Sequence, residues 1–263
     1  MKLYYNTQNA ESKCNWVMRS LLKGWTGAVP VYTRGELDNI PSHFWGFIHD
    51  NEQRIKALKD AGIDWYFWDM PYWGRWREHM DKGYYWRASR NSLHYKHVKD
   101  YPSDRFKKWN VTPREYGSGS KILVCPSSET MTRYTTGMDV KMWVSMITMA
   151  LQKHTDRYIE VRYKPRANGT SGPAAATIPF EEQARDTHCV VTCISLAAID
   201  AQILGIPTIC HPSSFAADIS STKLEEIENP RCVDRQQWFN NLAYSQFTHT
   251  EIESGFAQEI LDA

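Results

Sequence analysis

Short apolar stretches alternate along the chain with longer stretches in which apolar residues recur every three or four positions. The first kind predicts buried strands, and the second predicts amphipathic helices. Before residue 70, the predicted strands are 2–6, 29–33, 44–48 and 64–68, and the predicted helices are 15–23 and 51–59. Strands that alternate with helices are typical of a parallel sheet with helices packed on it.

The same alternation returns after a Gly-Ser-Gly-Ser linker at residues 117–120. The predicted strands are 121–125, 158–163, 189–192 and 207–210, and the predicted helices are 138–153, 180–184, one that begins at Ser195, 235–242 and 250–261. We expect an α/β protein with two small Rossmann-like halves and a cleft between them. The expected boundaries are 1–116 for the N-terminal domain, 117–232 for the C-terminal domain, and 233–263 for helices that pack back on the N-terminal half.

The regular pattern stops between Pro71 and Glu115, where aromatic and charged residues take over. This segment holds eleven Lys and Arg against five Asp and Glu, although the whole chain carries a net charge of only +1. Cations interleaved with aromatic rings suit a phosphate backbone and stacked bases. The candidate acceptor-binding residues are Tyr72, Trp73, Arg75, Arg77, Arg87 and Arg90. An equally open interpretation is that these arginines bind a donor or brace the cleft.

Composition narrows the class of protein. Apolar residues make up 42% of the 263 residues and charged residues 23%, which argues against disorder. The six cysteines form no CxxC pair, so we expect a reduced, cytoplasmic protein without a zinc site. The start MKLYYNTQNAESK has no apolar signal core, and no run is long enough to span a bilayer. We therefore expect no membrane insertion.

Several familiar motifs are absent from the sequence. It contains no GxGxxG, no GxxxxGK[ST] and no GxSxG, which argues against a dinucleotide oxidoreductase, a P-loop enzyme and an α/β-hydrolase. It also lacks an Asp-x-Asp pair of the kind that carries a metal-bound diphosphate. Any diphosphate site would then depend on cationic side chains and on backbone N–H groups.

The stretch VVTCISLAAIDAQILGIPTICH reads as a strand, a turn, a helix that begins at Ser195, and a second strand. Free N–H groups at a helix start can hold an anion, with the helix dipole adding to the attraction. The alternative is a plain helix cap in a βαβ unit. Strand 121–125 leads to Ser127 and Ser128, and strand 158–163 leads to Lys164 and Arg166. Because parallel strands end at one edge of a sheet, we expect these residues to share a crevice.

The stretches KILVCPSS, VRYKP and SLAAIDAQILGIPTICH resemble the donor-binding half of a glycosyltransferase of the two-Rossmann-domain (GT-B) type. WDMPYWGR, YYWRASRN and WFNNLAYSQFTHTEIESG resemble segments of phage and bacterial proteins related to such transferases. The resemblance implies a nucleotide diphosphate-sugar donor, such as a UDP-sugar, and no other cofactor. The donor-binding residues it implies are Ser127 and Ser128 on phosphate, Lys164 and Arg166 as neutralising cations, Ser195 and Leu196 on the leaving diphosphate, and Asp200 on the ribose.

Glycosyl transfer requires a group that takes the proton of the acceptor hydroxyl. Asp69 follows the apolar strand 64–68 and precedes a Pro-Tyr-Trp-Gly loop, so it is the candidate catalytic base. The alternative is that Asp69 caps a turn before Pro71. His43 and His49 are alternative bases.

The expected function is that of a metal-independent glycosyltransferase. Its basic aromatic segment favours a hydroxymethylated pyrimidine in phage DNA as the acceptor. Two alternatives stay open: a surface-polysaccharide or small-glycan glycosyltransferase, and a non-catalytic module that binds a nucleotide or nucleic acid.

Overall fold

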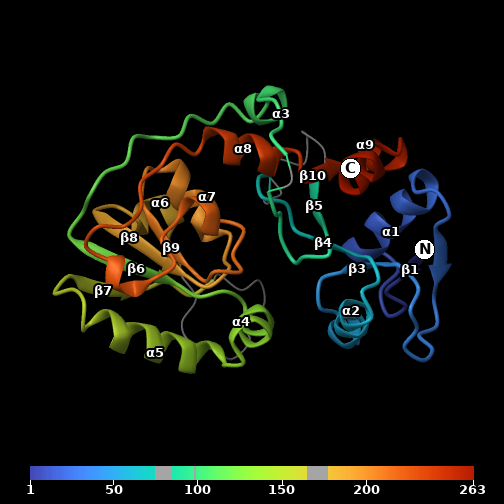
Figure 1. Cartoon of the computed structure of the whole chain (residues 1–263), viewed down its shortest axis with the longest axis horizontal. Helices are drawn as coiled ribbons and strands as arrows, with labels where there is room; N and C mark the ends of the chain where they lie inside the picture. The colour runs from blue at the N-terminus through green and yellow to red at the C-terminus, as the bar shows by residue number, and fades with distance from the viewer. Residues whose placement is uncertain (75–84, 98, 165–176) are drawn as a thin grey trace. The chain divides into compact units, whose positions relative to one another are not determined.

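The computed structural model describes residues 1–74, 85–97, 99–164 and 177–263 and contains two compact units (Figure 1). Unit 1 comprises Met1–Trp109 together with Gln237–Ala263, and unit 2 comprises Asn110–Gln236. Each unit has its own sheet and its own apolar core.

Within the described residues, the sheet of unit 1 has six strands in the order β10-β5-β4-β3-β1-β2. Their bounds are β1 (Lys2–Tyr4), β2 (Val29–Val31), β3 (Ser42–Trp45), β4 (Trp65–Asp69), β5 (Tyr85–Arg90) and β10 (Gln246–Thr248). Strands β1 to β4 are parallel, whereas β5 is antiparallel to β4 and β10 is antiparallel to β5. The sheet is therefore a parallel core extended by two antiparallel strands.

The helices of unit 1 come from both ends of the chain. They are α1 (Lys13–Gly24), α2 (Asn51–Asp60), α3 (Asp104–Lys107), α8 (Gln236–Ala243), α9 (His249–Glu253) and α10 (Phe256–Asp262). Helix α1 packs so closely on α9 that a Cβ on Gly24 would lie 1.9 Å from the carbonyl oxygen of Ile252. Lys23 also donates to Glu253 at 2.9 Å. The expected packing of the C-terminal helices on the N-terminal half is confirmed.

The sheet of unit 2 is parallel throughout the described residues, in the order β7-β6-β8-β9. Its strands are β6 (Lys121–Cys125), β7 (Tyr158–Val161), β8 (Thr187–Thr192) and β9 (Thr208–Cys210). Its helices are α4 (Glu129–Thr136), α5 (Val140–Leu151), α6 (Phe180–Gln183) and α7 (Ala197–Ile203), with 3-10 turns η2 (Ala217–Ile219) and η3 (Leu224–Glu226).

Both faces of the unit 2 sheet are covered, which explains why its strands read as nearly continuous apolar runs. Trp143 and Leu151 of α5 pack against one face. Ala201 of α7 and Ala184, just after α6, pack against the other. The expected α/β fold with two Rossmann-like halves is confirmed.

Some elements differ from the expectation. Strand β5 lies inside the segment where the regular pattern stops, and α4 and β10 were not predicted. The helix expected at 250–261 is two helices, because Gly255 takes a left-handed conformation (φ 84°) between them. None of the described helices is long and apolar enough to cross a membrane.

Candidate functional site

The parallel strands of unit 2 place their carboxyl ends at one edge of the sheet. Cys125 of β6 lies opposite Thr192 of β8, and Thr192 lies opposite Cys210 of β9. The chain after β7 joins the same edge, because Val161 lies opposite Val124 of β6. The loops that carry the predicted donor-binding residues therefore start side by side, at the place where open α/β sheets bind ligands.

Buried hydroxyl groups tie the loops after β6 and β8 together. Ser127 is 7% exposed, and its Oγ accepts the N–H of Ile194 at 3.0 Å. Thr192 Oγ1 donates to the carbonyl of Cys125 at 2.6 Å and accepts the N–H of Ser195 at 3.3 Å. Ser127 thus lies inside this edge and fixes its backbone.

The other predicted residues of the two loops lie nearer the surface. Ser128 is exposed and caps the start of α4, where its Oγ accepts the N–H of Met131 at 3.4 Å. Ser195 and Leu196 are half-buried and precede α7, which begins at Ala197 and not at Ser195. Asp200, in the first turn of α7, is also half-buried.

The predicted cations of this edge have different surroundings. Lys164 follows β7 and is exposed. Arg166 lies outside the described residues. The preceding arginine, Arg162, donates to the carbonyl of Ile178 at 3.0 Å, and its guanidinium lies 5.6 Å from the centre of the Phe180 ring. Arg162 therefore packs on the start of α6 and on the residues just before it, while Lys164 remains on the surface.

His211, directly after β9, is a polar residue of this edge that was not among the predicted site residues. Its backbone N–H donates to the carbonyl of Cys193 at 3.1 Å, which joins the loops after β9 and β8. Its Nδ1 accepts the N–H of Ser213 at 3.1 Å, and burial lowers the pKa of the ring below its ordinary value. The signal in the sequence was a polar residue directly after the apolar run IPTIC.

In unit 1, Asp69 ends β4 at the carboxyl edge of the parallel strands. Its side chain is 27% exposed, and its Oδ2 accepts from Arg87 Nη2 at 2.6 Å. Its Oδ1 accepts its neighbour's N–H, that of Met70, at 2.7 Å. The candidate base is thus a carboxylate at the surface that is held by a cation from β5.

Of the predicted acceptor-binding residues, the four that the structure describes do not lie together on one surface. Tyr72 is 0% and Trp73 6% exposed, and their N–H groups donate to Gln246 Oε1 at 2.8 and 3.1 Å. Arg87 is buried at Asp69, whereas Arg90 is exposed at the other end of β5 and donates to a carboxylate, that of Asp64, at 2.7 Å. Arg75 and Arg77 lie outside the described residues.

The two alternative bases differ in exposure. His43 is fully buried in the core, where its Nδ1 accepts from Trp68 Nε1 at 2.9 Å and its ring stacks on Tyr66 at 4.6 Å. Burial holds the pKa of His43 well below its ordinary value, so the ring is neutral. His49 is exposed in the turn after β3. Of the two, only His49 is at the surface.

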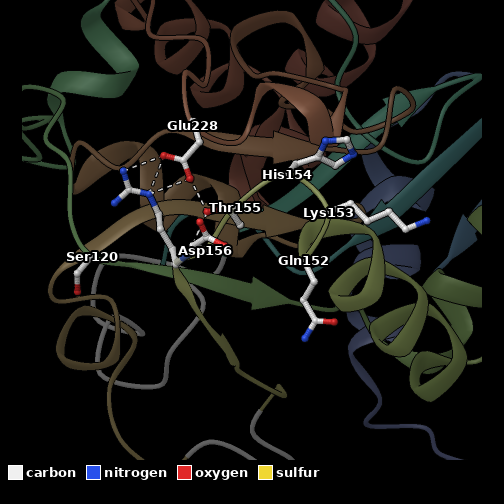
Figure 2. A pocket seen from close by; sticks show the side chains of 8 residues that line it. Ser120, Gln152, Lys153, His154, Thr155, Asp156 and Glu228 are labelled. Atoms are coloured by element: carbon white, nitrogen blue, oxygen red, sulfur yellow. Dashed lines mark hydrogen bonds and ion pairs between the residues drawn. The ribbon is translucent and has the colours of Figure 1, made fainter.

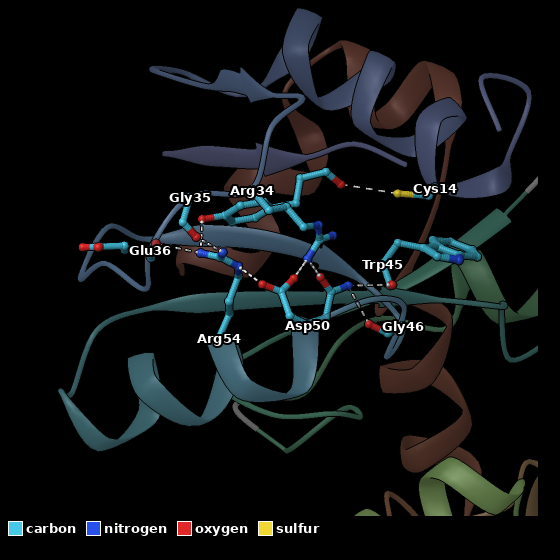
Figure 3. Close-up of polar contacts among 10 residues, drawn as sticks. Cys14, Arg34, Gly35, Glu36, Trp45, Gly46, Asp50 and Arg54 are labelled. Atoms are coloured by element: carbon cyan, nitrogen blue, oxygen red, sulfur yellow. Dashed lines mark hydrogen bonds and ion pairs between the residues drawn. The ribbon is translucent and has the colours of Figure 1, made fainter. Parts of the chain in front are cut away.

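A second ionic cluster follows β2 and β3 in unit 1 (Figure 3). Asp50 accepts from Arg34 and from Arg54, whose Nε lies at 2.8 Å, and Arg54 also donates to the carbonyl of Glu36 at 3.1 Å. Burial acts to raise the pKa of Asp50, but the hydrogen bond of Arg34 and the charges of both arginines outweigh it and lower the pKa. The cluster fixes the loop between β2 and β3 on the start of α2.

A hollow lies elsewhere in unit 2 (Figure 2). It has a volume of about 630 Å³ and is lined by Ser120, Gln152, Lys153, His154, Thr155, Asp156, Arg157 and Glu228. Ser120 precedes β6 and Arg157 precedes β7, so the hollow lies at the amino ends of the strands. It is therefore at the opposite edge from the predicted donor-binding residues. The described residues include no group of three or more His, Cys, Asp or Glu that could hold a metal ion.

Comparison with solved structures finds a similar fold in a sugar transferase. The chain is similar to Thermosulfurimonas dismutans KpsC, beta Kdo 2,7 transferase, with a TM-score of 0.56 and 13% identity, over 98% of this chain and 99% of that chain. It is also similar to Thermosulfurimonas dismutans KpsC, beta Kdo 2,4 transferase, with a TM-score of 0.46 and 11% identity, over 87% of each chain. No protein-family model and no curated protein matches the chain.

At 13% identity, the first similarity shows the fold alone. The fold is GT-B-like, as the sequence led us to expect. The similarity to particular phage and bacterial proteins stays a prediction.

Proposed function

We propose that the chain is a glycosyltransferase that moves a sugar from a nucleotide-activated donor to a hydroxyl group of a glycan. The observation that carries the proposal is the fold shared with the beta Kdo 2,7 transferase over 98% of this chain, which includes both units. Because one fold can host many reactions, the chemistry has to come from the residues of the site.

The donor binds at the carboxyl edge of the unit 2 sheet. Lys164 is an exposed cation there and neutralises donor phosphate, with Ser128 and the backbone at Ser195 and Leu196 as hydrogen-bonding partners. Asp200 contacts the ribose. The support for this assignment is that the strand order brings three loops with these residues to one edge.

Asp69 acts as the base on the acceptor. A base must be ionised, partly accessible and fixed in orientation. The Asp69 side chain is 27% exposed and is bound by Arg87 at 2.6 Å. His43 does not compete for this role, because its ring is enclosed in the core.

A glycan acceptor fits the described residues better than DNA does. DNA binding depends on cations that neutralise phosphates and on rings that stack on bases. Arg87 and Arg90 each pair with a carboxylate, and the rings of Tyr72 and Trp73 are buried. We therefore propose a surface-polysaccharide or small-glycan acceptor, in line with the Kdo transfer that the similar structure is named for.

A turnover assay tests this function. The purified chain is incubated with nucleoside-diphosphate sugars and with nucleotide-activated Kdo, each in the presence of oligosaccharides or of duplex DNA with hydroxymethylated pyrimidines. We expect nucleotide release from one donor, and mass spectrometry should show one oligosaccharide extended by one sugar while the DNA is unchanged. Turnover on DNA alone would reverse our choice of acceptor. Tight nucleotide binding without turnover of any donor would instead indicate a non-catalytic binding module.

A further inference from the structure

The ion pair between Asp69 and Arg87 is asymmetric in exposure. The Asp69 side chain is 27% exposed, whereas that of Arg87 is 5% exposed. Asp69 lies directly opposite Arg87 in the antiparallel register of β4 and β5. The carboxylate thus reaches the surface while its cation lies beneath it.

Arg87 also contacts two buried side chains, His94 and Tyr72. Its Nη1 donates to His94 Nδ1 at 2.5 Å, and its guanidinium lies 5.7 Å from the centre of the buried Tyr72 ring. Burial, and then the charge of Arg87, hold the pKa of His94 well below its ordinary value, so the ring is a neutral acceptor. The Tyr72 hydroxyl in turn accepts the N–H of Tyr95 at 2.9 Å. The guanidinium therefore has one fixed orientation.

Joining two strands does not require this arrangement. Arg90 and Asp64 connect the same two strands at their other end through an exposed pair at 2.7 Å. Burying a guanidinium costs desolvation energy that a single carboxylate does not fully offset. Moreover, Arg87 Nε is buried without a hydrogen-bond partner among the described residues. A buried cation that fixes a partly exposed carboxylate is instead typical of a site in which one group orients another.

We propose that Arg87 is a positioning residue, which holds the Asp69 carboxylate in the orientation that takes the proton of the acceptor hydroxyl, with His94 and Tyr72 holding Arg87. The inference rests on the proposed function. In the transfer, the acceptor oxygen bonds to the anomeric carbon, and its proton passes to Asp69. The bond between that carbon and the donor phosphate oxygen breaks, and its electron pair leaves with the nucleotide.

Substitution of Arg87 tests the inference. Arg87→Met should lower kcat about 100-fold, because misplacing a reacting group by about 1 Å has that effect, while KM for the donor stays within about threefold. Arg87→Lys should recover part of the loss, since an ammonium can still reach Asp69 although it cannot also bind His94. The matched control is Arg105→Met, which removes another buried arginine of unit 1, paired with Glu251 and not with Asp69. The control should lose stability but keep kcat per folded molecule.

A loss of kcat in Arg87→Met no greater than in the control would overturn the positioning role. If the wild type turns over no donor, the proposed function fails. The effect of Arg87 on the Asp69 carboxylate is then measured without an activity assay. The readout is the ¹³C carboxyl signal of Asp69 by NMR. It should shift in Arg87→Met and stay in place in Arg105→Met; an unchanged signal in both variants would also overturn the inference.

Discussion

Ser127 Oγ accepts the backbone N–H of Ile194 at 3.0 Å, so the loop after β6 holds the loop after β8 in place. Both groups are buried, and the contact joins residues 67 positions apart in the sequence. We expect Ser127→Ala to lower the free energy of unfolding by about 1–3 kcal/mol, because the N–H of Ile194 loses its acceptor without gaining water. Urea denaturation measures the loss. Ser145→Ala, at an exposed position of α5, is the control and should change it by less than about 0.5 kcal/mol.

The Asp50 cluster predicts a pH-dependent contribution to stability. The pKa of Asp50 is lower in the folded chain than in the unfolded chain, so its contribution is complete above the ordinary value and is lost as the pH falls towards the folded value. Asp50→Asn should therefore lower the free energy of unfolding most near neutral pH. The difference in this free energy between the variant and the wild type should shrink below about pH 4. Urea denaturation at several pH values tests this. A difference that stays constant down to pH 3 would exclude the ion pair as its cause; Asp60→Asn, exposed on the same helix, is the control.

Lys164 should contribute to binding of the donor phosphates. We expect Lys164→Ala to weaken binding of a nucleoside diphosphate by roughly 1–3 kcal/mol, through loss of a charge-assisted contact. Lys153→Ala is the matched control, because Lys153 is exposed in the same unit but lines the hollow at the amino ends of the strands. Calorimetry compares the two. Equal affinities in both variants would remove Lys164 from the donor site.

Asp69→Asn should stop sugar transfer and leave the fold intact. An amide keeps the shape of the carboxylate but does not accept the proton, so kcat should fall by about 100- to 10,000-fold, while the donor binds as before. Asp64→Asn, directly before β4, removes a carboxylate that pairs with Arg90 and not with Arg87, and this variant should keep its activity. If Asp69→Asn still transferred sugar, Asp69 would not be the base, and the exposed His49 would become the candidate.

The sequence predicted most elements because their signals are local. In the run KILVC, four apolar residues follow Lys121, and Pro126 comes directly after the run. Strand β6 spans the same five residues, Lys121–Cys125. Strand β5 was not predicted, because its sequence, YWRASR, includes two arginines and is typical of a polar loop. The partner that makes Arg87 compatible with burial is Asp69, which lies 18 positions earlier and meets it only across the sheet.

The candidate site was less predictable than the fold for a related reason. The sequence shows that Tyr72 and Trp73 are aromatic, but it does not show that the side chain of Gln246, 174 and 173 positions later, binds the backbone of both. Likewise, Ser127 and Ser128 are adjacent and chemically equal, yet one is buried and the other exposed. Tertiary contacts decide which of two similar residues faces solvent. The periodicity of the sequence does not show these contacts.

Unit 1 consists of two separate segments, Met1–Trp109 and Gln237–Ala263, whereas unit 2 is continuous. The ribosome therefore finishes all of unit 2 before it makes β10, the strand that covers the free side of β5. Domains generally fold as units during synthesis. Unit 2, although second in the sequence, can thus fold first, while β5 and the turn at Tyr72 wait for Gln246 to emerge. A released chain that is truncated shortly before β10 should carry a native unit 2 and an incomplete unit 1.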